Sequence, residues 1–242
     1  GVSNVIYGVI RKQSRLRLRL LVRQWIGSTL TIGSGGSAGP EGPIVTIGAV
    51  IGSNLARLLR LDAKSGTTLL GCGAAAGLAS VFNAPIAGIF FVLEVLLRDF
   101  SLRTFTPIVI ASVLAAATTQ SILGSNEPLF GVGPEFFENN PVPFTIGMTP
   151  AFVAFGIACG LVAVLFIKTM QWSERCFGRI PIPEMLRPGV GALLLGLLGV
   201  GYMVFVAPRG TELTSDPVPP FFGNGYIVIM RLLDPASYVD AE

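Results

Sequence analysis

The chain has 242 residues, of which 51% are hydrophobic and only 13% are charged, with a mean hydropathy of +0.69 and a net charge of +3. Charged residues usually make up about 25% of a soluble domain, so this composition excludes an ordinary soluble domain and predicts a multi-pass integral membrane protein. Histidine is absent and the three cysteines lack metal-ligand spacing, so we expect no metal site, no disulfide framework and no cofactor. The cysteines are Cys72, Cys159 and Cys176.

A run of basic residues precedes the first long apolar stretch. Basic residues that flank membrane segments are retained in the cytoplasm, so we expect this run on the inner side of a plasma (inner) membrane, near lipid headgroups. Nucleic-acid binding is not expected, because the run has no interleaved aromatic residues and no recognisable binding module. The run comprises Arg11, Lys12, Arg15, Arg17, Arg19 and Arg23.

The rest of the chain alternates apolar segments with breaks rich in Gly and Pro. Several predicted helices are shorter than the roughly 20 residues that cross a membrane, which predicts broken or re-entrant helices that line a cavity or are buried in protein. Two segments are predicted loops, Gly124 to Pro143 and Arg209 to Asn224. Helices are predicted at Val22–Ser34, Ile44–Leu59, Thr67–Val81, Ile86–Leu97, Phe105–Leu123, Thr149–Cys176 and Met185–Ala207.

The segment GTTLLGCGAAAGLASVFNAPIAGIFFVLEVLLRDF contains two local signals. Gly73 and Gly77 are separated by three alanines, a pattern that predicts a smooth face for close helix packing. Asn83 precedes Ala84 and Pro85, and we expect it to cap the helix that Pro85 begins.

The stretch TIGSGGSAGPEGPIVTIGAVIG holds a single charged residue, Glu41. As a helix cap, its carboxylate would contribute roughly 0.3–1 kcal/mol through the helix dipole. A charge at membrane depth costs more, roughly 2.5–3.5 kcal/mol, so capping alone does not explain this residue. A glycine-rich turn that enters a helix presents free N–H groups to an anion, and Glu41 could occupy the place of that anion as a tethered gate.

The same stretch also fits the dinucleotide-binding pattern G-x-G-x-x-A between Gly33 and Ala38. That pattern should follow a strand and carry an acid about 20 residues further on. Here the preceding segment is predicted to be helical, and after Glu41 the next acid is Asp62. A nucleotide-binding enzyme is therefore not favoured, and we do not expect an enzyme.

The segments GSAGPEGPIVTIGAVIGSNLARL and GCGAAAGLASVFNAPIAGIFFVLEV, in this order, resemble the CLC family of chloride channels and chloride/proton exchangers. The family motifs are G-K/R-E-G-P, which contains the gating glutamate, and GAAAG followed by FNAPLAG. The resemblance covers Ser28 to Phe100 and implies an all-α membrane protein with the CLC-type inverted-repeat fold, short broken and re-entrant helices, and a homodimer. Residues 1–242 would then be a partial transmembrane domain, from the first repeat to the start of the second, with no soluble domain.

The resemblance also implies roles for residues near Glu41. Glu41 would be the gate, and the family's usual basic residue before it is Pro40 here, which removes one N–H from the anion site. Exchangers in the family carry two consecutive acids where this chain has Glu94 and Val95, so the proton-relay position is lost at Val95. The implied anion-binding backbone comprises Gly39, Glu41, Gly42, Ile44 and Val45.

The sequence therefore predicts passive chloride conduction through a pore gated by Glu41, with chloride and membrane lipid as partners. The alternative within the family is chloride/proton exchange by another internal route that could use Glu94, although a structural role for Glu94 near the helix end beside Arg98 is slightly favoured over a relay role. A purely structural membrane scaffold is the remaining alternative.

Overall fold

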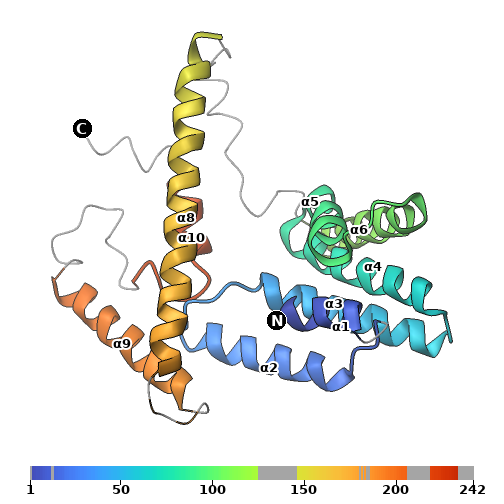
Figure 1. Ribbon diagram of the computed structural model, residues 1–242, viewed down its shortest axis with the longest axis horizontal. Coiled ribbons are helices and arrows are strands. Elements are labelled where there is room, and N and C mark those ends of the chain that lie inside the picture. The colour runs from blue at the N-terminus through green and yellow to red at the C-terminus, as the bar shows by residue number, and fades with distance from the viewer. Residues whose placement is uncertain are drawn as a thin grey trace. The chain divides into compact units, whose positions relative to one another are not determined.

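The computed structural model describes residues 2–11, 14–124, 146–179, 181, 183, 186–205 and 219–233. Every regular element within these residues is a helix. The chain divides into two units, the first made of residues 1–131 and 218–242 and the second of residues 132–217. Figure 1 labels most of the helices and colours them in chain order.

The first unit contains most of the helices and all of the residues that the sequence assigns to the gate. Its core consists of α4 packed between α3 and α6, with α5 and the following π-helix η1 against it, while α1 and α2 pack on α3. The elements are α1 (Val2–Arg11), α2 (Leu18–Gly33), α3 (Glu41–Leu58), α4 (Ala63–Phe82), α5 (Pro85–Phe91), η1 (Val92–Leu97), α6 (Leu102–Leu123) and α10 (Tyr226–Leu233).

Helices α3 and α4 approach so closely that their backbones nearly touch. A Cβ atom added at Gly48 would collide with the carbonyl group of Gly73, and one added at Gly52 would collide with that of Leu69. A Cβ at Gly77 would press against Ile44, at 3.1 Å. The packing face predicted at Gly73 and Gly77 is therefore confirmed, and its partner is a second small-x-x-x-small pair on α3.

The interior of this unit is apolar and built from side chains of several helices. Val45 of α3, Leu70 of α4, Leu93 of η1 and Ile108 of α6 are each at most 1% exposed. Because side chains in a close-packed core contact one another on all sides, these residues fix how the start of α3 packs on the rest of the unit.

Residues at the helix ends explain why the chain turns where it does. The Asp62 carboxylate accepts the N–H of Lys64 at 3.2 Å and so caps α4. Asn83 ends α4 with φ of 50°, a left-handed conformation that asparagine tolerates, and Ala84 is the residue that precedes α5. The prediction that Asn83 caps α5 was therefore wrong, and its side-chain oxygen instead accepts a hydrogen bond from Gln120 of α6.

Within its described residues, the second unit has a 3₁₀ turn, η2 (Ile146–Met148), followed by two long apolar helices. They are α8 (Thr149–Arg179) and α9 (Arg187–Phe205), and most of their side chains are exposed. Four described segments are long and apolar enough to cross a membrane: Ala63–Phe82, Leu102–Leu123, Ile146–Arg179 and Arg187–Phe205. The exposed apolar faces of the second unit match those of helices in a lipid or protein environment.

Each helix predicted from the sequence overlaps an observed one, with its ends shifted by a few residues. The segment predicted as one helix over Ile86–Leu97 divides at Phe91 into α5 and η1. Helices α1 and α10 were not predicted. The predicted loop from Gly124 lies outside the described residues after its first position, and the loop predicted to end at Asn224 is described only from residue 219, where the chain turns into α10.

Candidate functional site

A glycine-rich loop connects α2 to α3 and places Glu41 at the first position of α3. Gly35 has φ of +87°, a conformation that L side chains rarely adopt, and the N–H of Gly36 donates to the carbonyl of Thr31 at 2.8 Å. Pro40 then precedes the helix with φ of −77°. The turn predicted from the Gly and Pro residues is therefore present, and Glu41 follows it as the first residue of α3.

The side chain of Glu41 folds back over the loop that precedes it. A Cβ atom added at Gly39 would overlap the Glu41 carboxylate, so only glycine leaves room for this position. The hydroxyl of Tyr226 donates a hydrogen bond to Glu41 Oε1 at 2.7 Å, across 185 residues of sequence. The carboxylate is exposed in the described chain, and it lies at the positive end of the α3 dipole.

The five residues predicted to bind an anion fall together at this helix start. The N–H of Ile44 already donates to the carbonyl of Pro40 at 3.0 Å, and Pro43 has no N–H. The first turn therefore leaves the N–H groups of Glu41 and Gly42 as the donors that a helix does not use internally. The predicted set is Gly39, Glu41, Gly42, Ile44 and Val45.

Tyr226 is the contributor that the sequence analysis missed. It begins α10 after a turn in which Gly223 and Gly225 have φ of +70° and +71°, and its N–H donates to the side-chain oxygen of Asn224 at 3.2 Å. Partial burial and the neighbouring Glu41 carboxylate raise the pKa of Tyr226 above its usual range, so the hydroxyl keeps its proton and is the donor. The sequence Gly-Asn-Gly-Tyr signals a turn into a helix, but nothing local identifies the partner of the tyrosine.

The second pair of interest, Glu94 and Val95, lies on η1. Both side chains are exposed, and η1 is a π-helix, a feature frequent near functional sites. Within the described residues, Glu94 forms no hydrogen bond and no ion pair, including none with Arg98, which follows η1 with φ of 52°. A structural role for Glu94 through Arg98 therefore has no contact to support it.

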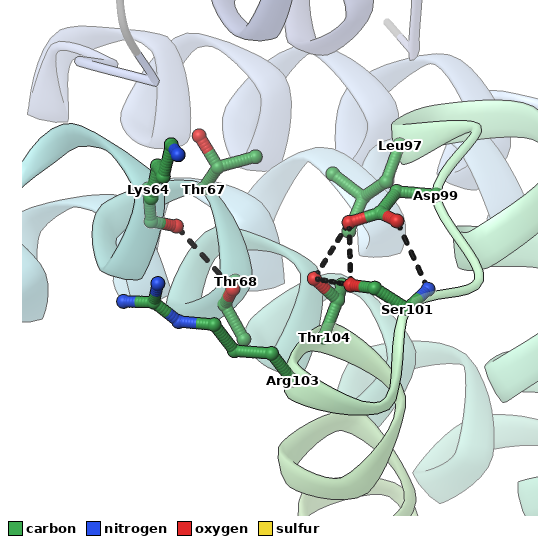
Figure 2. Close-up of a pocket in the computed structure, with 8 residues that line it drawn as sticks. All are labelled: Lys64, Thr67, Thr68, Leu97, Asp99, Ser101, Arg103 and Thr104. Atoms are coloured by element: carbon green, nitrogen blue, oxygen red, sulfur yellow. Dashed lines mark hydrogen bonds between the residues drawn. The ribbon is translucent and has the colours of Figure 1, made fainter.

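A hollow of about 380 Å³ lies away from Glu41, beside the N-terminal ends of α4 and α6 (Figure 2). Within it, the Asp99 carboxylate accepts the N–H of Ser101 at 2.9 Å and the hydroxyl of Thr104 at 2.8 Å, and these bonds lower the pKa of Asp99. The network ties the end of η1 to the start of α6 and contains none of the predicted site residues. Its lining is Lys64, Thr67, Thr68, Leu97, Asp99, Ser101, Arg103 and Thr104.

Residues 1–239 match the family described as voltage gated chloride channel. The chain belongs to this family, the CLC family. The match extends well beyond the segment that carries the sequence resemblance and includes Tyr226 and its turn. This family match excludes a nucleotide-binding enzyme. The dinucleotide-binding pattern at Gly33 to Ala38 requires a preceding strand, and the structure has the helix α2 there.

Individual relatives agree with the family match. A ClcB-like chloride channel protein of Ralstonia nicotianae is 30% identical over 85% of the chain, and the chain covers 44% of that relative. The voltage-gated ClC-type chloride channel ClcB of Citrobacter koseri is 28% identical over 86% of the chain, again with 44% of the relative covered. The chain thus spans less than half the length of these relatives.

The solved structures extend the likeness to the fold. A CLC-type fluoride/proton antiporter is 29% identical, with a TM-score of 0.72 over 99% of this chain and 65% of the antiporter chain. A slow cyanobacterial Cl⁻/H⁺ antiporter has a TM-score of 0.64 at 20% identity, covering 88% of this chain and 56% of that one. The protein is an all-helical, multi-pass integral membrane protein with the CLC-type fold.

Proposed function

We propose that this protein conducts chloride passively across a membrane through a pore that Glu41 gates. In this proposal residues 1–242 form part of a CLC transmembrane domain that works as a homodimer in the plasma (inner) membrane. The family match and the names of the curated relatives, which are chloride channels, support chloride as the transported ion.

One observation supports the proposed role of Glu41 as the gate. The Glu41 carboxylate lies over Gly39 at the N-terminal end of α3, beside the first-turn N–H groups that would otherwise face an anion. A carboxylate and a chloride ion compete for the same positive dipole end, so an ionised Glu41 excludes the ion and a protonated one releases the place. The proposed donors to the anion are the N–H groups of Glu41 and Gly42, while Gly39, Ile44 and Val45, the other residues expected from the sequence, border the same helix start.

The test is chloride efflux from liposomes that contain the protein expressed from its full reading frame. The E41Q variant keeps the side-chain volume but removes the charge, so it should conduct at neutral external pH about tenfold faster than the wild type, as expected if the carboxylate outcompetes the ion by about 1.4 kcal/mol. External acid should accelerate the wild type and leave E41Q unchanged.

The control for E41Q is its folding, because a carboxylate that only caps α3 would act through stability. Size-exclusion profiles and thermal stability in detergent should match those of the wild type. A well-folded E41Q protein that conducts with wild-type pH dependence would contradict the gate.

Passive conduction is proposed over exchange because Val95 occupies the position at which exchangers of the family carry the second acid, and valine binds no proton. Chloride/proton exchange is the second candidate, and it is supported by the two antiporter structures and by the exposed position of Glu94 on η1.

Proton movement distinguishes these two candidates. In liposomes with an inward chloride gradient and a pH indicator, passive conduction predicts no uphill proton transport, whereas uphill transport would establish exchange. Fluoride should be tested beside chloride in the same assay, because one of the similar structures is a fluoride/proton antiporter.

A further inference from the structure

The turn that precedes α10 lies directly against the loop that carries Glu41. The N–H of Ala38 donates to the carbonyl of Gly223 at 3.1 Å, and the N–H of Gly223 donates to the carbonyl of Gly35 at 3.4 Å. The side chain of Phe222 also reaches Gly35, where an added Cβ would be 3.7 Å from its ring. Two glycine-rich segments about 185 residues apart are therefore joined by their backbones.

This pairing aims the hydroxyl of Tyr226 at the carboxylate. Gly225 has a positive φ, and the side-chain oxygen of Asn224 accepts the N–H of Tyr226. The turn therefore fixes the backbone of Tyr226 and the direction in which its side chain leaves the chain. The ring of Tyr226 packs near that of Phe82, at 6.2 Å between centroids. The phenol is thus held from two sides while its hydroxyl donates to Glu41 Oε1.

We propose that Tyr226 is a positioning residue for the gate, which holds the ionised Glu41 carboxylate at the start of α3 and thereby sets the pH at which Glu41 releases. The inference rests on the proposed role of Glu41 and adds its partner. A hydroxyl that donates to a carboxylate favours the ionised form over the protonated one. Loss of the hydroxyl therefore makes protonation easier and shifts the opening to higher pH.

No other charged or titratable side chain on the described elements packed around Glu41 hydrogen-bonds to its carboxylate. Among these groups, Arg57 lies in the last turn of α3, at the opposite end from Glu41, and donates to the carbonyl of Leu16 at 2.8 Å. The groups concerned are Tyr7 on α1, Arg19 and Arg23 on α2, Arg57 on α3, Lys64 and Cys72 on α4, and Arg231 on α10.

The test is the pH dependence of chloride efflux from liposomes containing the Y226F variant of the full protein. Phenylalanine keeps the ring against Phe82 and the backbone pairing, and removes only the hydroxyl. We expect the pH of half-maximal conduction to rise by about half a unit to one unit, which is a threefold to tenfold change in the protonation equilibrium. Efflux at neutral pH should rise with it.

Two controls separate positioning from a structural role. Y202F removes a phenolic hydroxyl from α9 and should leave the pH midpoint unchanged. In the E41Q background, Y226F should have no further effect on conduction or its pH dependence, because the carboxylate that it positions is absent.

A folded Y226F protein whose pH midpoint is unchanged or lower would overturn the inference, as would an equal effect of Y226F with and without Glu41. These outcomes leave the gate itself standing if E41Q conducts freely and without pH dependence. Retention of the pH response in E41Q would instead overturn the proposed function, so the two failures are distinguishable.

Discussion

The first unit carries two carboxylates for which we consider a role in transport, Glu41 and Glu94, and their surroundings differ. Glu41 stands at the start of α3, beneath a glycine-rich loop, and accepts a hydrogen bond from a tyrosine 185 residues away. Glu94 stands on η1, and within the described residues it has no hydrogen bond and no ion pair. Both are exposed in the described chain, so exposure alone does not distinguish them.

The difference matches what the proposed gate would require of a carboxylate. Its competitor is an anion, so it must reach a helix N-terminus with free N–H groups, and it must be held there by contacts that protonation weakens. Glu41 lies at a helix start and accepts a hydrogen bond from Tyr226, whereas Glu94 lies within η1, which follows α5 directly and is not a helix start. The predictions below test this contrast in order of the effect that we expect.

After E41Q, the largest effect on efflux is expected from G39A, which acts on the position of the Glu41 carboxylate. The added methyl group would overlap the Glu41 carboxylate, a mobile side chain, so the carboxylate should move while the backbone stays in place. Efflux at neutral pH should rise about threefold, equivalent to roughly 0.65 kcal/mol, with a weaker response to acid.

The matched control for G39A is G27A, because Gly27 lies within α2 and an added Cβ there meets nothing within 4 Å. G27A should leave efflux and its pH response at wild-type values, since alanine is favoured over glycine inside a helix. Identical behaviour of the two variants would show that the space over Gly39 does not govern the carboxylate.

A smaller effect is expected from D99N, because Asp99 lies just after η1, the helix that contains Glu94. This variant should change the stability of the protein and not its conduction. Hydrogen bonds from Ser101 and Thr104 lower the pKa of Asp99 in the folded protein. The contribution of Asp99 to the free energy of unfolding is therefore complete above its unfolded pKa of 3.8, and it is lost as the pH falls through the lower pKa of the folded protein. D99N should lower the melting temperature at pH 7 by about 2 °C.

The difference in melting temperature between D99N and the wild type should shrink as the pH falls below 3.8 and Asp99 becomes protonated, first in the unfolded chain and then in the folded protein. Thermal unfolding in detergent at several pH values measures it. The external pH response of efflux should not change in D99N, and a changed response would link this end of the unit to the gate.

The smallest effect is expected from E94Q. Because Glu94 is far in the chain from the α3 start and has no described partner, E94Q should conduct with the same pH midpoint as the wild type. Under chloride/proton exchange, E94Q would instead abolish uphill proton transport while chloride movement continued. Efflux and proton uptake measured in one preparation therefore decide which role Glu94 has.

Much of this contrast was predictable from local patterns. Apolar length and the positions of Gly and Pro predicted seven helices. One of them was predicted to begin at Ile44, and in the structure it begins three residues earlier, at Glu41. The prediction failed at Asn83, because the left-handed preference that suits asparagine to a helix end competes with its preference as an N-cap. It also missed α1 and α10, which are too short for hydropathy to distinguish from turns.

The sequence by itself determined the family, the helical class and the position of the carboxylate that we propose as the gate, because all three depend on residues that are neighbours in the chain. Tertiary structure alone decided which helix packs on the glycine face of α4 and which hydroxyl donates to the carboxylate of Glu41. Each of those contacts joins residues that are distant in sequence, and a long-range contact leaves no periodic signal in either of its two segments. Tyr226, the hydrogen-bond partner of Glu41, is therefore identified only when the turn before α10 is folded against the loop before α3.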